Sequence, residues 1–168
     1  MKEDFEKIFG GEPKEWLDSL PEFQRAPIGE LLTLYPPDQV AIKWLTANLE
    51  QTSPFGTEKK TDSTAFLKKL DDELQAFLCG NPKYNSERKE LVACVKKGRT
   101  YLVGAMSVAI APYLGVSAVF LAPAIVLSLF AIGKMSIHAW CSTQMDSRSD
   151  ACAKKDINKP RRNREKSA

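Results

Sequence analysis

A run of thirty-three residues without a charged side chain, from Tyr101 to Gly133, constrains this chain more than any other feature. Charged residues make up 27% of the whole sequence, so a neutral run of this length needs an apolar environment on every side. It exceeds the roughly 18 consecutive apolar residues at which a segment becomes a candidate membrane span. Either lipid or the rest of the polypeptide must therefore surround it.

The length of the run favours two helices over one. As a single straight helix it would measure about 50 Å, whereas the hydrocarbon core of a bilayer is about 30 Å thick. Pro112 removes a backbone donor and Gly115 permits a chain reversal, so we expect a turn near residues 112–117. The sequence predicts a transmembrane helical hairpin at 100–141. A single helix kinked at the repeats VAIAP and VFLAP, eleven residues apart, is another geometry that we consider.

Aromatic and basic residues flank the run as they flank membrane spans. Tyr101 and Trp140 stand at its ends and Tyr113 at the predicted tip, where they suit the head-group level. Basic side chains on both flanks predict two spans with both termini cytoplasmic. Those expected to contact anionic lipid are Lys96, Lys97, Arg99, Lys134, Arg161, Arg162 and Arg164. The expected partner is a bilayer that contains anionic lipid.

Small residues recur within the run at four-residue steps, at Ser107, Ala111 and Gly115. This spacing lets helices approach closely where lipid provides no hydrophobic drive to associate. We expect these residues to form a helix-packing seam. Because one hairpin encloses no lumen, a pore would require a homo-oligomer assembled along that seam.

Charge and hydropathy divide the rest of the chain. Residues 1–99 carry fifteen Lys/Arg and seventeen Asp/Glu, whereas residues 134–168 carry nine and four. Residues 1–99 show amphipathic helical periodicity, clearest at 37–51 and 63–80, and no convincing strand. Residues 142–168 are basic and poor in large apolar groups, which is typical of a disordered tail. The expected fold class is all-α: a small cytoplasmic helical domain, a hydrophobic hairpin and a basic tail.

The N-terminus and the cysteines indicate a reducing compartment. Acidic residues begin at the third position and no apolar segment follows, so we expect no cleaved secretory signal. Cys79, Cys94, Cys141 and Cys152 show no paired spacing, so we expect reduced thiols.

Candidate catalytic groups do not combine into a site. His138 is the only histidine, and with Cys141 it forms H-x-x-C, but a zinc site needs two further ligands at diagnostic spacing. Gly133 and Lys134 match the glycine and lysine of a phosphate-binding loop, but the other residues of that loop are absent. The motif S-x-x-K at 86–89 lacks the partner motifs that a catalytic serine of this type needs. We expect no enzyme, no metal and no cofactor.

These features support a non-enzymatic integral membrane protein that self-associates and forms a pore or disrupts membranes, as a small bacterial effector or toxin does. A membrane-tethered adaptor is the first alternative, its body binding a protein through Trp16, Trp44 or residues 52–62. The second is a helical protein that buries the apolar hairpin as its own core. The basic segment KPRRNREK at 159–166 attracts phosphates of either lipid or nucleic acid, and the adjacent apolar run favours lipid.

Overall fold

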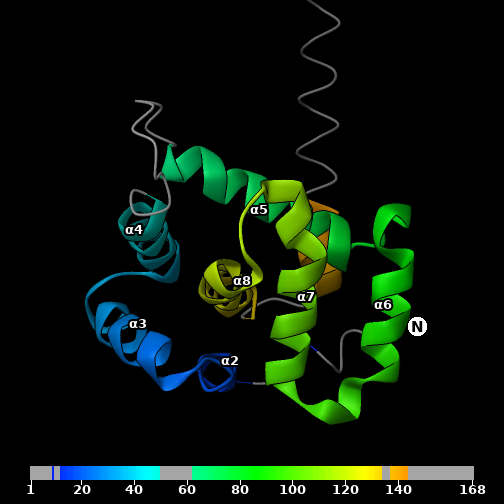
Figure 1. Cartoon of the computed structure of the whole chain (residues 1–168), viewed down its shortest axis with the longest axis horizontal. Helices are drawn as coiled ribbons and strands as arrows, with labels where there is room; N and C mark the ends of the chain where they lie inside the picture. Colours follow the sequence, from blue (N-terminus) through cyan, green and yellow to red (C-terminus); the bar gives the residue numbers. More distant parts are fainter. Residues whose placement is uncertain (1–8, 10–11, 50–61, 134–136, 144–168) are drawn as a thin grey trace, which may run out of the picture.

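The computed structural model describes residues 9, 12–49, 62–133 and 137–143 (Figure 1). Throughout these residues the chain is helical with short connections and contains no strand, which confirms the all-α prediction. The basic tail from residue 144 onward and most of the predicted 52–62 loop lie outside the described residues.

Seven α-helices and two short 3-10 helices carry labels in this part of the chain. Their bounds are α2 Pro13–Leu17, α3 Glu22–Leu34, α4 Pro37–Leu49, α5 Ser63–Leu78, η2 Pro82–Tyr84, α6 Asn85–Ala93, η3 Val95–Lys97, α7 Arg99–Leu114 and α8 Ala118–Ile132. A further helical segment covers 137–143.

Local sequence explains where α5 begins and ends. Asp62 caps the helix, because its carboxylate accepts a hydrogen bond of 3.0 Å from the backbone N–H of Thr64. Gly80 follows the helix with φ of +93°, a conformation that favours glycine. A Cβ at Gly80 would also stand 2.9 Å from a guanidinium nitrogen of Arg88, so α6 packs closely over the end of α5.

The helix α8 forms the centre of the fold. It packs against α2, α4, α5 and α7, and Figure 1 shows it in the middle of the ring that these helices make. Most of its side chains are buried, and the buried ones are Leu121, Pro123, Ala124, Ile125, Val126, Leu127, Leu129 and Ile132. The inner faces of the surrounding helices complete this core with Trp16, Val40, Leu45, Leu70 and Leu74. The apolar run and the preceding helices therefore share one hydrophobic core.

The apolar run is broken into two helices by residues 115–117, inside the segment where we expected a turn. Gly115 ends α7 in the left-handed region, with φ of +70°, and the Ser117 hydroxyl caps α8 by accepting from the backbone N–H of Phe120. Within the described residues neither helix alone has the length and hydropathy of a membrane span. Taken together, α7 and α8 reach the length and hydropathy of a membrane span, as a pair bent by 111°.

A disulfide joins Cys79 at the end of α5 to Cys141 in the 137–143 segment. The expectation of reduced thiols is therefore wrong for this pair. The two cysteines are 62 residues apart in sequence, and only the return of the chain past α5 brings them together. The loop that the bond closes contains both α7 and α8.

Candidate functional site

The candidate functional site is the boundary between the α7–α8 hairpin and the helices that enclose it, which we call the body (α2 to α6). Both helices of the hairpin lack charged side chains from Tyr101 onward. Polar groups of the body reach the hairpin at a few positions, in addition to the apolar packing of the shared core.

At the first turn of α8, the body supplies a hydrogen bond that the helix cannot make for itself. The carbonyl of Val119 would accept from the backbone N–H four residues later, but that residue is Pro123, which has none. The side-chain amide of Gln24, on α3, donates to this carbonyl over 3.3 Å. Next to it, the indole N–H of Trp44 donates to the carbonyl of Phe120 over 3.5 Å. Gln24 is 3% exposed, so its amide needs a partner as much as the carbonyl does.

Farther along α8, the Ser128 hydroxyl donates to Oδ1 of Asp71 on α5 over 3.0 Å. Desolvation raises the pKa of Asp71, and the hydrogen bond from Ser128 acts against that rise. This contact ties α5 to the central helix.

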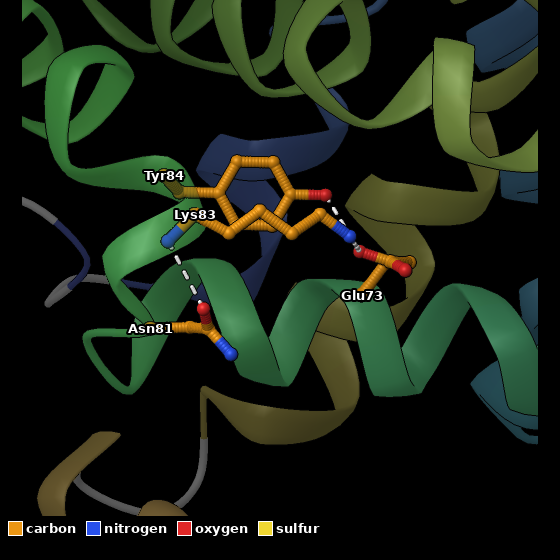
Figure 2. Close-up of polar contacts among 4 residues, drawn as sticks. All are labelled: Glu73, Asn81, Lys83 and Tyr84. Atoms are coloured by element: carbon orange, nitrogen blue, oxygen red, sulfur yellow. Dashed lines mark hydrogen bonds and ion pairs between the residues drawn. The ribbon is translucent and has the colours of Figure 1, made fainter.

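A cluster of Glu73, Lys83 and Tyr84 forms a polar clasp where α5 meets η2 (Figure 2). Lys83 Nζ and the Tyr84 hydroxyl both donate to Oε2 of Glu73, each over 2.6 Å. The side chain of Asn81 holds the turn by accepting from the backbone N–H of Lys83 over 3.0 Å. Desolvation raises the pKa of the Glu73 carboxyl, but the two hydrogen bonds and the Lys83 charge outweigh it and lower the pKa.

The clasp contacts the end of α7. Lys83 Nζ lies 3.4 Å from the centroid of the Tyr113 ring, and the rings of Tyr84 and Tyr113 meet edge to face at 5.5 Å. The start of α7 is held as well, because Arg99 forms an ion pair with Glu15 of α2. Each end of α7 is thus fastened to the body by a cation.

A groove of about 700 Å³ lies between α6 and α7. Glu87 and Glu90 line it from α6, and Leu91 and Phe77 are the buried side chains at its base. The α7 wall presents small and apolar residues between two tyrosines: Tyr101, Gly104, Ala105, Val108, Ala109, Pro112 and Tyr113. Val108 is 65% exposed, so this face of the hairpin is not covered by the body.

The residues of the predicted seam lie in different environments. Ser107 and Ala111 are buried on α7, and the Ser107 hydroxyl donates back to the carbonyl of Val103. Gly115 is exposed at the turn. The seam is therefore turned toward the interior over two of its three positions.

The three residues predicted to anchor the hairpin at the membrane interface also differ in their exposure. Tyr113 is 53% exposed and Tyr101 half-buried, but Trp140 is 8% exposed and belongs to the core. Among the expected lipid contacts, Lys96 and Lys97 are exposed and Arg99 is paired with Glu15. Those outside the described residues are Lys134, Arg161, Arg162 and Arg164.

The H-x-x-C pair does not assemble into a site. Cys141 is in the disulfide and His138 is exposed. Within the described ranges no group of three His, Cys, Asp or Glu side chains is placed to hold a metal ion. Trp16, a proposed partner contact, is 1% exposed and lies inside the core.

Sequence reasoning missed Gln24 and the clasp, because their roles depend on segments far apart in the chain. Pro123 at the start of a neutral helix was the one available signal, since it leaves an unpaired carbonyl that some donor must reach. Comparisons with known protein families, with curated proteins and with solved structures return no match for this chain.

Proposed function

We propose that this protein acts at membranes by storing an apolar helical hairpin inside its own fold and releasing it into a lipid bilayer. The observation that carries the proposal is the position of α8. A helix with no charge from end to end is wrapped by α2, α4, α5 and α7, and hydrogen bonds from the body reach it at three positions.

Hydrophobic energy differs little between the two locations of α8. Apolar side chains are removed from water both in the protein core and in hydrocarbon, so the transfer leaves most of their burial intact. What changes is the set of polar contacts at the boundary, and the inner faces of α4 and α5, which lose their cover. Release therefore costs both these polar contacts and the apolar burial of the inner faces, and insertion into lipid must offset the two together.

The dimensions favour insertion as a bent hairpin. At 1.5 Å per residue, α7 and α8 measure about 24 and 22 Å, somewhat less than the roughly 30 Å hydrocarbon core. A pair this short is accommodated by local thinning of the bilayer. With Lys96 and Lys97 held at the cytoplasmic surface, both termini stay on that side.

Self-association follows release. Ser107 and Ala111 are buried in the stored form and become available for helix packing only when α7 leaves the body. Hairpins joined along this seam form the pore, and the basic tail holds the assembly on anionic lipid.

The disulfide closes the stored form, because the Cys79–Cys141 bond ties the end of the hairpin to α5. A dithiol reductant opens it: the S–S bond breaks, both cysteines gain a proton and an electron, and the reductant is oxidised to its own disulfide. A reducing compartment thus favours the released hairpin.

The test uses the full chain as Cys94→Ser/Cys152→Ser, which keeps the disulfide, with Val119→Cys carrying a fluorophore. Val119 is 66% exposed at the hairpin tip, so the label does not disturb the core. Vesicles contain phosphatidylglycerol and a phospholipid with a nitroxide on its acyl chain. We expect the nitroxide to quench the label strongly after reduction and several-fold less before it. Dye release that rises more steeply than linearly with protein concentration is expected for an assembled pore.

A label at Lys68→Cys, on the exposed face of α5, is the matched control and should stay unquenched. Equal quenching in both redox states would support insertion but contradict the disulfide lock. Unquenched tip labels in both states, with protein left in the aqueous fraction, would overturn the proposal.

A second candidate function is the adaptor, and one observation favours it. Phe23 and Leu34, both on α3, are 71% and 73% exposed, which suits a protein contact on the body. An adaptor anchored by its hairpin would show the quenching but leave dye-loaded vesicles sealed.

A further inference from the structure

We infer that the groove between α6 and α7 is a binding site for one phospholipid with a primary ammonium head group, of the phosphatidylethanolamine class. The inference rests on the proposed function, and the site belongs to the stored form that meets the bilayer, because release separates α7 from α6. It adds a specific site and a head-group preference to that function.

The backbone of α7 carries an open acceptor beside the groove. Pro112 has no N–H, so the carbonyl of Val108 lacks the donor that a helix would normally provide. Both residues line the groove. The equivalent carbonyl in α8, at Val119, receives the side-chain amide of Gln24. A ligand with an N–H donor would complete the α7 position in the same way.

The opposite wall carries negative charge. Glu87 is half-buried and Glu90 exposed on α6, and neither has an ion-pair partner among the described residues. Two carboxylates, in a groove also lined by the residue whose carbonyl lacks its helical donor, favour a cation that donates hydrogen bonds. A primary ammonium meets both requirements, whereas a quaternary ammonium meets only the first.

The shape suits a single acyl chain. From Tyr101 to Tyr113 the α7 wall is about 18 Å long. The volume of the groove, about 700 Å³, falls within the range of small-molecule sites. Small side chains such as Gly104 and Ala105 keep the wall open along its length.

The ends of the groove argue against a basic peptide. Lys97 Nζ lies 4.6 Å from the centroid of the Tyr101 ring, and Lys83 Nζ stands over Tyr113 at the other end. Lys83 is already paired with Glu73, so the exposed Lys97 is the cation that repels a basic helix running past the groove, and it suits a phosphate placed next to an ammonium. Glu87 and Glu90 likewise repel a free fatty acid.

Titration calorimetry with monomeric single-chain lipids tests the inference on the full, oxidised chain. Lysophosphatidylethanolamine should bind about fivefold more tightly than the choline lipid, which has no N–H donor, and the choline lipid more tightly than the anionic glycerol lipid. In Glu87→Gln/Glu90→Gln the advantage of both zwitterionic head groups over the anionic glycerol head group should disappear. Glu30→Gln, on α3, should leave it unchanged.

Gly104→Leu should reduce binding about tenfold or more by filling the groove. A Cβ at Gly104 meets no atom within 4 Å, so the variant should fold, and Gly29→Leu on α3 is an equally open control. Equal affinity for all three lipids, normal binding by Gly104→Leu, or binding of a basic amphipathic peptide in place of lipid would overturn the inference. Loss of lysolipid binding in Gly104→Leu with normal quenching at position 119 would leave insertion intact. Normal lysolipid binding without quenching would defeat insertion instead.

Discussion

The two helices of the hairpin share a five-residue pattern that ends in proline. They differ in whether the body supplies the backbone hydrogen-bond donor that the proline lacks. VAIAP ends near the close of α7 and VFLAP opens α8, and each proline leaves the carbonyl of a valine four residues earlier without a donor. In α8 the body supplies that donor through Gln24, and the helix becomes the centre of the core. In α7 no side chain of the described body residues is known to replace the missing donor, and Val108 lines an open groove. Similar sequences can thus be structural in one helix and available for binding in the other.

The two helices also differ in how much of their surface is buried. The buried residues of α7 form one stripe, which consists of Leu102, Val103, Met106, Ser107, Ile110 and Ala111. Those of α8 extend around most of the helix. Because nearly every residue in both helices is apolar, no alternation of polarity marks which face of α7 is turned outward.

The largest expected effect comes from a lysine placed on each helix. Ile125→Lys puts a charge among fully buried side chains of α8 and should lower the free energy of unfolding by more than about 4 kcal/mol. Val108→Lys, at a residue 65% exposed on α7, should change it by about 0.5 kcal/mol or less. Urea denaturation followed by far-ultraviolet circular dichroism measures both. Comparable losses would mean that α7 and α8 are equally enclosed.

A double-mutant cycle sharpens the comparison of the two prolines. Gln24→Leu should cost about 2 kcal/mol, because it leaves the Val119 carbonyl unpaired. In a Pro123→Ala background the new N–H can donate to that carbonyl, so the same substitution should cost about 1 kcal/mol less. Additive costs in urea denaturation would show that Gln24 does not replace the missing donor.

A smaller loss than that of Gln24→Leu is expected at the clasp that fastens α7, and it depends on pH. The folded state lowers the pKa of Glu73 below its ordinary value of 4.5, so the carboxylate stabilises the fold above that pH. Its contribution is lost as the pH falls through the folded-state pKa. Glu73→Gln should therefore cost about 1 kcal/mol at pH 7 and less as the pH drops below 4.5. A cost that stays constant down to pH 3 would rule out the charged clasp.

Much of the fold follows from local patterns in the sequence. The all-α class was predicted from helical periodicity, and α5 was predicted from the amphipathic pattern of residues 63–80. Such features depend on neighbours within one or two helical turns, so they can be recognised without a tertiary structure.

The candidate site was less predictable, because its contacts join distant segments. Gln24 and Val119 are 95 residues apart, and Cys79 and Cys141 are 62 residues apart. Nothing near Cys79 indicates a disulfide, and nothing near Gln24 indicates that it completes a helix elsewhere in the chain.

The sequence by itself determined that a neutral segment of thirty-three residues must avoid water, and it favoured a turn near residues 112–117. It could not choose the apolar environment, because hydrocarbon and a protein core exclude water from the same side chains. Only the tertiary structure decided that α8 lies among α2, α4, α5 and α7, while one face of α7 stays open. That choice depends on whether enough apolar surface from other helices converges on each face, which is a property of the packed chain.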